Sequence, residues 1–268
     1  MYIFVCEDSL DGILTGIYDA WNFKIEHAGL THDDLRLASV ESENYELFCE
    51  YINVPASLEK AQKVSRTICE KLGMEFYDVI VAAALSKEPT GKKELDKADA
   101  IYKTVVLALR SPARAKVINY LGNPYIHRVF TLSRATHNEA HHLMGFLRFS
   151  ELENGVLFST IHPKNHALPL LAEHFADRFP QENFILYDEN RRLAAIHRAS
   201  KKNYMLVDAS DLNQDIIHNY SEKEQQFRDL WLTFFDSIAI QARTNPELQA
   251  QNIPKRFWKD AIELERML

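Results

Sequence analysis

The hydrophobic pattern of the chain changes its period near residue 146, and this change limits the folds that the chain can adopt. Upstream, apolar side chains recur every three to four residues over Ala98–Arg110 and Tyr125–Phe146, which is typical of helices packed on one face. Downstream, a period of two over Val156–Ile161 and Phe184–Asp188 predicts strands. Helices followed by a group of strands are typical of an α+β fold. We therefore predict a small antiparallel sheet surrounded by helices.

Further elements of this part follow from the same patterns. Strands are expected at Leu147–Leu152, Leu193–His197 and Met205–Val207, with hairpin turns at Glu153-Asn154-Gly155 and Glu189-Asn190-Arg191. Helices are expected at Pro112–Leu121, Leu168–Phe179, Ser221–Arg243, Pro246–Gln249 and Pro254–Leu268.

The N-terminal part has an α/β pattern of its own. A strand at Tyr2–Glu7 is followed directly by a helix that Asp8 or Ser9 can cap. Two more strands (Leu35–Val40, Leu47–Val54) and two helices (Ser57–Gly73, Met74–Leu85) complete it. The polar segment Ser86–Asp99 contains Pro89 and Gly91 and is the best linker candidate. We predict an N-terminal α/β part over 1–86 and an α+β domain over 95–268.

Composition excludes several classes of protein. The apolar runs are shorter than the ~18 residues that a membrane span needs. The N-terminus lacks the basic region and long apolar run of a signal peptide. Three cysteines without a CxxC spacing indicate neither a disulfide framework nor a zinc ribbon. We expect a protein of the reducing cytoplasm with no membrane partner.

Charge is unevenly distributed along the chain. Residues 1–100 carry 10 Lys and Arg against 19 Asp and Glu, whereas residues 101–205 carry 14 against 8, and residues 206–268 carry 7 against 11. The middle segment is therefore basic within a chain of net charge −7, and it holds eight of the 11 histidines. Its arginines favour contacts with phosphate or carboxylate. Pairing with carboxylates of the acidic flanks is the alternative.

No acidic residue lies between Lys103 and His137. Cations in this stretch without nearby carboxylates face either solvent or an anionic partner. Tyr120, Tyr125 and Phe130 interleave with the cations and can stack on bases, although core packing is the alternative for Phe130.

Few catalytic motifs are present. His137 and His141 have the i,i+4 spacing of metal ligands, but Glu139 does not follow the first His as the HExxH motif requires. We therefore predict no metal site. The GxSxG elbow, the GxxxxGK[ST] loop and the GxGxxG loop are absent, so no cofactor is predicted.

Titratable side chains near the ends of the predicted strands are the best candidates for chemistry. Glu151, His174 and Asp188 are the candidate acids and bases. The candidate nucleic-acid-binding residues are Arg148, Lys164, Arg178, Arg191, His141 and His197. Salt bridges between these carboxylates and the interleaved arginines are the alternative.

Long stretches of the chain resemble a bacterial family described as DNA metabolism or repair proteins. The resemblance is carried by YIFVCEDSLDGILTGIYDAW, EAHHLMGFLRFSEL, IHPKNHALPLLAEHFADRFPQENFILYDENRRLAAIH and LWLTFFDSIAIQARTNPELQAQNIPKRFW. It implies a radical-SAM protein with a helix-hairpin-helix element, encoded nearby, as partner, and some relatives are fused to a uracil-DNA-glycosylase-superfamily domain. Positions that fit the family pattern include Glu139, Arg148, Pro163, Asp188, Arg191 and Trp231. The resemblance implies no catalytic residue.

Three hypotheses follow. The first is a DNA repair or DNA metabolism protein that binds nucleic acid and acts with the radical-SAM partner. The second is a nucleobase-directed enzyme, glycosylase-like or hydrolytic. The third is a non-catalytic protein-interaction module whose basic residues are paired internally.

Overall fold

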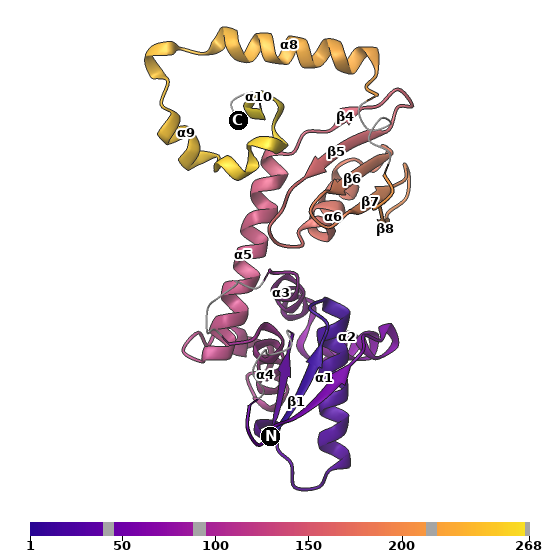
Figure 1. The fold of residues 1–268 in the computed structure, drawn as a ribbon, viewed down its shortest axis with the longest axis vertical. Coiled ribbons are helices and arrows are strands. Elements are labelled where there is room, and N and C mark those ends of the chain that lie inside the picture. Colours follow the sequence, from indigo (N-terminus) through magenta and orange to yellow (C-terminus); the bar gives the residue numbers. More distant parts are fainter. Residues whose placement is uncertain (40–45, 88–94, 213–218, 266–268) are drawn as a thin grey trace. The chain divides into compact units, whose positions relative to one another are not determined.

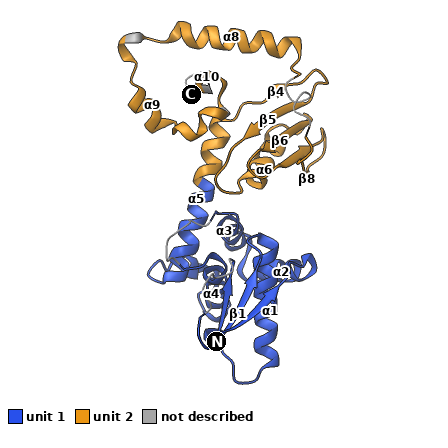
Figure 2. Ribbon diagram, viewed as in Figure 1, with its two compact units in different colours: residues 1–137 blue, residues 138–268 orange. Residues whose placement is uncertain are grey.

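The structure is a computed structural model that describes residues 1–39, 46–87, 95–212 and 219–265. Contacts group the chain into two compact units, Met1–His137 and Asn138–Leu268 (Figure 2). One unit holds a three-stranded sheet and the other a five-stranded sheet, each with helices. The predicted α+β class with an N-terminal α/β part is therefore confirmed.

Unit 1 is built on a parallel sheet with β1 (Tyr2–Cys6) between β2 (Leu35–Ala38) and β3 (Glu50–Val54). Helix α1 (Leu10–Glu26) follows β1 directly and begins at Ser9, whose side chain accepts the N–H of Gly12. A Cβ at Gly12 would lie 2.4 Å from the carbonyl oxygen of Glu7. The helix can therefore pack this close to β1 because residue 12 has no side chain.

The remaining helices of unit 1 enclose one core. They are α2 (Leu58–Leu72), α3 (Met74–Ala84), α4 (Lys97–Arg110), the 3₁₀ helices η1 (His32–Asp34) and η2 (Arg114–Asn119), and the first part of α5 (Pro124–Phe146). Helix α4 begins inside the predicted linker, because Asp96 caps it and Asp99 is buried against β2. Residues 88–94 of that linker lie outside the described residues, and the predicted boundary at 86–95 stays a prediction.

Unit 2 contains a sheet in the order β4-β5-β6-β7-β8: β4 (Ser150–Glu151), β5 (Leu157–Ile161), β6 (Phe184–Asp188), β7 (Leu193–His197) and β8 (Tyr204–Asp208). The sheet is mixed rather than antiparallel, because β5 and β6 run parallel. Helix α6 (Leu168–Arg178) carries the chain back between them, as a parallel pair requires (Figure 1). Leu171, Phe175 and Phe184 belong to the core between α6 and the sheet.

The C-terminal segment after the sheet contains, within its described residues, the 17-residue helix α8 and four shorter helices. They are α8 (Glu222–Ile238), the 3₁₀ helices η3 (Gln241–Arg243) and η4 (Lys255–Asp260), α9 (Pro246–Asn252) and α10 (Ile262–Glu265). Phe257 and Leu264 are buried, whereas α8 has no buried residue. The predicted helix Ser221–Arg243 ends at Ile238, since Ala239 is extended.

No helix in the described part of the chain is long and apolar enough to cross a membrane.

Candidate functional site

The three candidate catalytic residues do not share one site. Glu151 pairs with Leu157 at the start of β5, whereas Asp188 pairs with Ile161 at its end. Four residues of strand separate these two positions, which corresponds to about 13 Å. His174 lies on α6 with its ring against Phe175. The carboxyls of Glu151 and Asp188 therefore cannot act on the same atom of a substrate.

Asp188 is a structural carboxylate at the end of β6. It is 0% exposed and pairs with Arg191 at 3.0 Å. Burial raises its pKa, and the Arg191 guanidinium opposes that rise. A buried carboxylate with one internal cation fits the salt-bridge alternative better than a general base.

The Arg191 side chain is hydrogen-bonded to the loop that follows β5. Its guanidinium donates to the carbonyl oxygens of Pro163 and Lys164 as well as to Asp188. On the other side, Glu139 of α5 accepts the backbone N–H groups of Lys164 and Asn165 at 3.0 and 2.7 Å. Loop 163–165 is thus held by both its N–H and C=O groups, and we call Glu139, Asp188, Arg191 and this loop the loop network.

His166 completes the loop network on its C-terminal side. Its Nδ1 atom is buried and has no hydrogen-bond partner among the residues that the structure describes. Burial, with the nearby Arg191, lowers the pKa of this imidazole to about 4. His166 is therefore neutral at physiological pH.

Arg148 and Trp231 are joined through a carboxylate that the sequence analysis did not single out. Glu263 of α10 accepts Arg148 Nη2 at 3.1 Å and Trp231 Nε1 at 3.2 Å. Glu263 lies more than 100 residues from Arg148, and no local pattern in the sequence marks it as a partner.

The other predicted nucleic-acid-binding residues are divided between the interior and the surface. His197 is 1% exposed, and its two ring nitrogens lie 2.9 and 2.7 Å from the carbonyl oxygens of Glu182 and Lys201. Lys164, Arg178 and His141 are exposed. Buried histidine and paired arginine side chains are not available to a phosphate, whereas the three exposed side chains are.

The basic stretch 103–134 in unit 1 also splits into buried and exposed cations. Lys103 is buried and donates to the carbonyl oxygens of His32 and Leu35, and burial lowers its pKa. Arg128 is buried and donates to the carbonyl oxygen of Leu95. These two cations belong to the core of unit 1, and a ligand cannot reach them.

The exposed cations of this stretch are Arg110, Arg114, Lys116 and Arg134. None of the four forms an ion pair within the described ranges. Arg114 has a φ of 47°, in the left-handed region that a non-glycine residue rarely adopts. We call these four residues the unpaired cation set.

Two aromatic side chains of the same stretch are also exposed. Tyr120 is 56% exposed and follows η2, and Phe130 is 37% exposed on α5. Core packing was the alternative to stacking for Phe130, and its ring is partly exposed and so partly available for stacking. Exposed cations with interleaved aromatic rings are the side chains that single-stranded nucleic acids contact.

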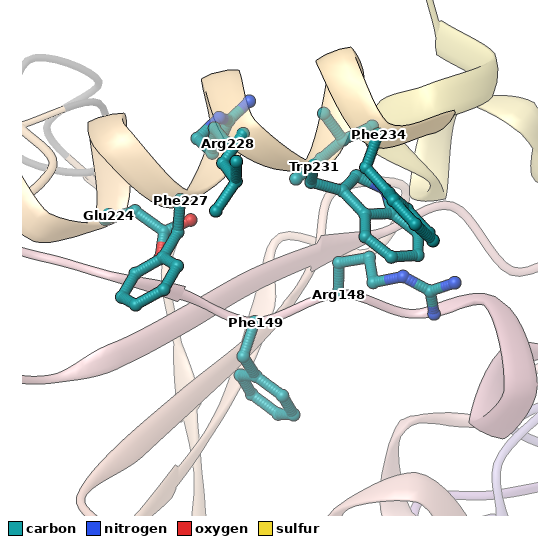
Figure 3. A pocket seen from close by; sticks show the side chains of 9 residues that line it. Arg148, Phe149, Glu224, Phe227, Arg228, Trp231 and Phe234 are labelled. Atoms are coloured by element: carbon teal, nitrogen blue, oxygen red, sulfur yellow. The ribbon is translucent and has the colours of Figure 1, made fainter. Parts of the chain in front are cut away.

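A separate groove of about 580 Å³ lies beneath α8 in unit 2. Figure 3 shows Phe227, Trp231 and Phe234 pointing from α8 toward the segment that carries Arg148 and Phe149. Arg228 stacks over Tyr220 and donates to Ser150, and Glu224 accepts the backbone N–H of Glu151. The charged groups of the groove therefore have internal partners, and its free surface is apolar.

The buried thiol of Cys6 is not a reactive nucleophile. Cys6 is buried, and burial raises the pKa of its thiol to about 12. A thiol with this pKa is protonated and weakly nucleophilic. No group of three or more His, Cys, Asp or Glu side chains in the described part of the chain is arranged to hold a metal ion.

A known protein family matches most of unit 2 and part of unit 1. The model of a family described as a domain of unknown function, DUF4130, matches residues 95–263. That range begins just before α4 and ends at Glu263, so it contains the unpaired cation set, the loop network and the groove beneath α8. A search of curated proteins found no match.

Proposed function

The chain belongs to the DUF4130 family of domains of unknown function, and from this premise we propose that it is a DNA repair or DNA metabolism protein that binds DNA through the unpaired cation set. The observation that carries the proposal is the exposure of Arg110, Arg114, Lys116 and Arg134 in a stretch without carboxylates. Exposed Lys and Arg side chains that neutralise phosphates release the counterions condensed on the nucleic acid, and this release favours binding.

Exposed aromatic rings support single-stranded DNA as the preferred form. Tyr120 and Phe130 lie in the same stretch of chain as the four cations. A base that is not paired in a duplex can stack on such rings, which is worth about 1–3 kcal/mol per base.

Backbone strain at Arg114 also supports a role beyond folding. A left-handed φ at a non-glycine residue costs about 1 kcal/mol. The strained turn places the Arg114 side chain in solvent, between the exposed Arg110 and Lys116 in sequence.

The family resemblance supports a radical-SAM protein as partner. In this proposal the chain holds DNA, and the chemistry on the DNA belongs to the partner. The separation of Glu151 from Asp188 across the sheet is consistent with that division of roles.

Fluorescence anisotropy of labelled single- and double-stranded DNA against the full chain tests the proposal. We expect binding at low salt, with tighter binding of the single strand. Alanine at Arg114 or Lys116 should weaken binding and reduce the magnitude of the slope of log K against log salt by about 0.7 each for a single strand. Lys71→Ala is the matched control, because Lys71 is exposed in the acidic N-terminal part. Absence of binding at low salt, or equal losses with Lys71→Ala, would contradict the proposal.

A further inference from the structure

Helix α8 lacks the buried face that usually stabilises a helix. It is 17 residues long and has no buried residue. A helix of this length is marginally stable in water unless an apolar face packs against something. The helix nevertheless carries several large, exposed apolar side chains, which together form a surface that a partner can bury.

The exposed apolar side chains of α8 form one stripe. Phe227, Leu230, Trp231, Phe234 and Ile238 follow the spacing i, i+3, i+4, i+7 and i+11, and each is between 41 and 63% exposed. At about 100° per residue these positions lie within roughly 100° of arc on one side of the helix. We call these five residues the α8 seam.

The seam itself carries no charge. Asp229 and Asp236 fall roughly 180–200° from Phe227 around the helix, on the opposite side. Arg228 lies beside the seam and is occupied by Tyr220 and Ser150. Glu224 lies about 60° from Phe227, on the other edge of the seam, and accepts the backbone N–H of Glu151. The five seam side chains can therefore meet those of a second copy while both flanking charges keep their internal partners.

The groove beneath α8 has a fixed floor. Glu263 accepts hydrogen bonds from both Trp231 and Arg148, and Phe149, next to Arg148, packs its ring against Phe175 and Phe184. Preorganised apolar grooves lose little conformational entropy when they are filled. The groove of about 580 Å³ is open to large side chains from outside.

The area of the seam is sufficient for a modest dimer. Large apolar side chains that are about half exposed leave roughly 100 Å² each for a partner to cover. Five such side chains provide about 500 Å² per copy and about 1,000 Å² for a pair, which is near the lower limit of specific interfaces.

We propose that the α8 seam packs against the same seam of a second copy of this chain. In a twofold pair, the exposed parts of the two seams face each other across the open sides of the two grooves, so each copy covers apolar side chains of the other. A twofold contact of this kind closes on itself and stops at the dimer. This inference is independent of the proposed DNA binding, because the seam lies in unit 2 and the unpaired cation set in unit 1.

Sedimentation velocity of the full chain over a range of micromolar concentrations tests the proposal. We expect a mass of twice the 31.0 kDa of one chain at the higher concentrations. Leu230→Glu and Phe234→Glu each place a carboxylate in the seam and should give the mass of one chain. Because both side chains are about half exposed, these variants should keep the helix content and thermal stability of the original chain.

Thr233→Glu is the matched control. Thr233 is exposed on α8 but lies about 120° from the centre of the seam, so this variant should remain a dimer. A single-chain mass for the unmodified protein at every concentration would overturn the proposal. A dimer that persists in both Leu230→Glu and Phe234→Glu would also overturn it, because the contact would then lie elsewhere.

Discussion

The stretch 103–134 in unit 1 and the loop network in unit 2 both carry cations, but different groups lie within reach of those cations. In unit 2, Arg191 is held by Asp188 and by two carbonyl oxygens of loop 163–165. In unit 1, Arg110, Arg114, Lys116 and Arg134 are exposed and form no ion pair within the described ranges. The comparison teaches that residue type alone does not identify a binding cation. What decides is whether a buried acceptor lies nearby.

The two regions should therefore respond differently to substitution. Changes in the loop network should cost stability and leave DNA binding intact in the folded protein. Changes in the unpaired cation set should weaken DNA binding and leave the stability of the protein unchanged.

The largest loss of stability is expected for Glu139→Ala. Glu139 is 1% exposed, and its removal leaves the backbone N–H groups of Lys164 and Asn165 without acceptors. Two such losses should lower the free energy of unfolding by about 4 kcal/mol in urea denaturation. Glu139→Gln keeps one acceptor oxygen and should lose about half as much. A loss below 1 kcal/mol for Glu139→Ala would show that the loop network does not hold unit 2 together.

A somewhat smaller loss is expected for Arg191→Ala. This change leaves the buried carboxylate of Asp188 without its cation, which should cost about 3 kcal/mol. Arg192→Ala is the control, because Arg192 is the next residue in the chain and its side chain is exposed. DNA affinity of the folded Arg191→Ala protein should match that of the original chain. A specific drop in affinity at unchanged stability would instead place Arg191 in the DNA interface.

His166 should make the stability of unit 2 depend on pH. Its folded-state pKa of about 4 lies below the usual value near 6.5, so the folded state takes up its proton later than the unfolded state as pH falls. The contribution of His166 is present above pH 6.5 and is lost as pH falls toward 4, by at most about 3 kcal/mol. The difference in unfolding free energy between the original chain and His166→Gln should change over this window. A difference that stays constant from pH 7 to pH 4 would contradict this account of His166.

The smallest effect on stability is expected for Arg114→Gly. Glycine tolerates the left-handed φ of 47° at this position, so the free energy of unfolding should change by less than about 1 kcal/mol. DNA affinity should nevertheless fall, because one phosphate contact is lost. Equal affinity for Arg114→Gly and the original chain would remove Arg114 from the proposed interface.

Much of the fold could be predicted from periodicity. Helices such as Leu58–Leu72 and strands such as Phe184–Asp188 lie close to the predicted ranges, because each buries one regular face. The parallel pairing of β5 and β6 could also have been predicted, since a helix was predicted between these two strands and a helix is the usual crossover connection of a parallel pair. Strand β4 is shorter than predicted, since only Ser150 and Glu151 pair with β5.

The division of the cations into paired and unpaired could not be predicted. Lys103 and Arg128 are held by backbone carbonyl oxygens, which carry no mark in the sequence. Glu263 contacts Arg148 only because the C-terminal segment folds back onto the segment that precedes β4. The absence of carboxylates between Lys103 and His137 pointed to every cation of this stretch alike, and only the structure separates the four exposed ones from the buried Lys103 and Arg128.

The most direct test of the central claim is the salt dependence of single-stranded DNA binding for the original chain and for a variant with alanine at Arg110, Arg114, Lys116 and Arg134. Each phosphate contact contributes about 0.7 to the slope of log K against log salt for a single strand. We predict that the slope of the variant is smaller by about 3, with the unfolding free energy unchanged. Identical slopes for the two proteins would contradict the claim that these four cations bind DNA.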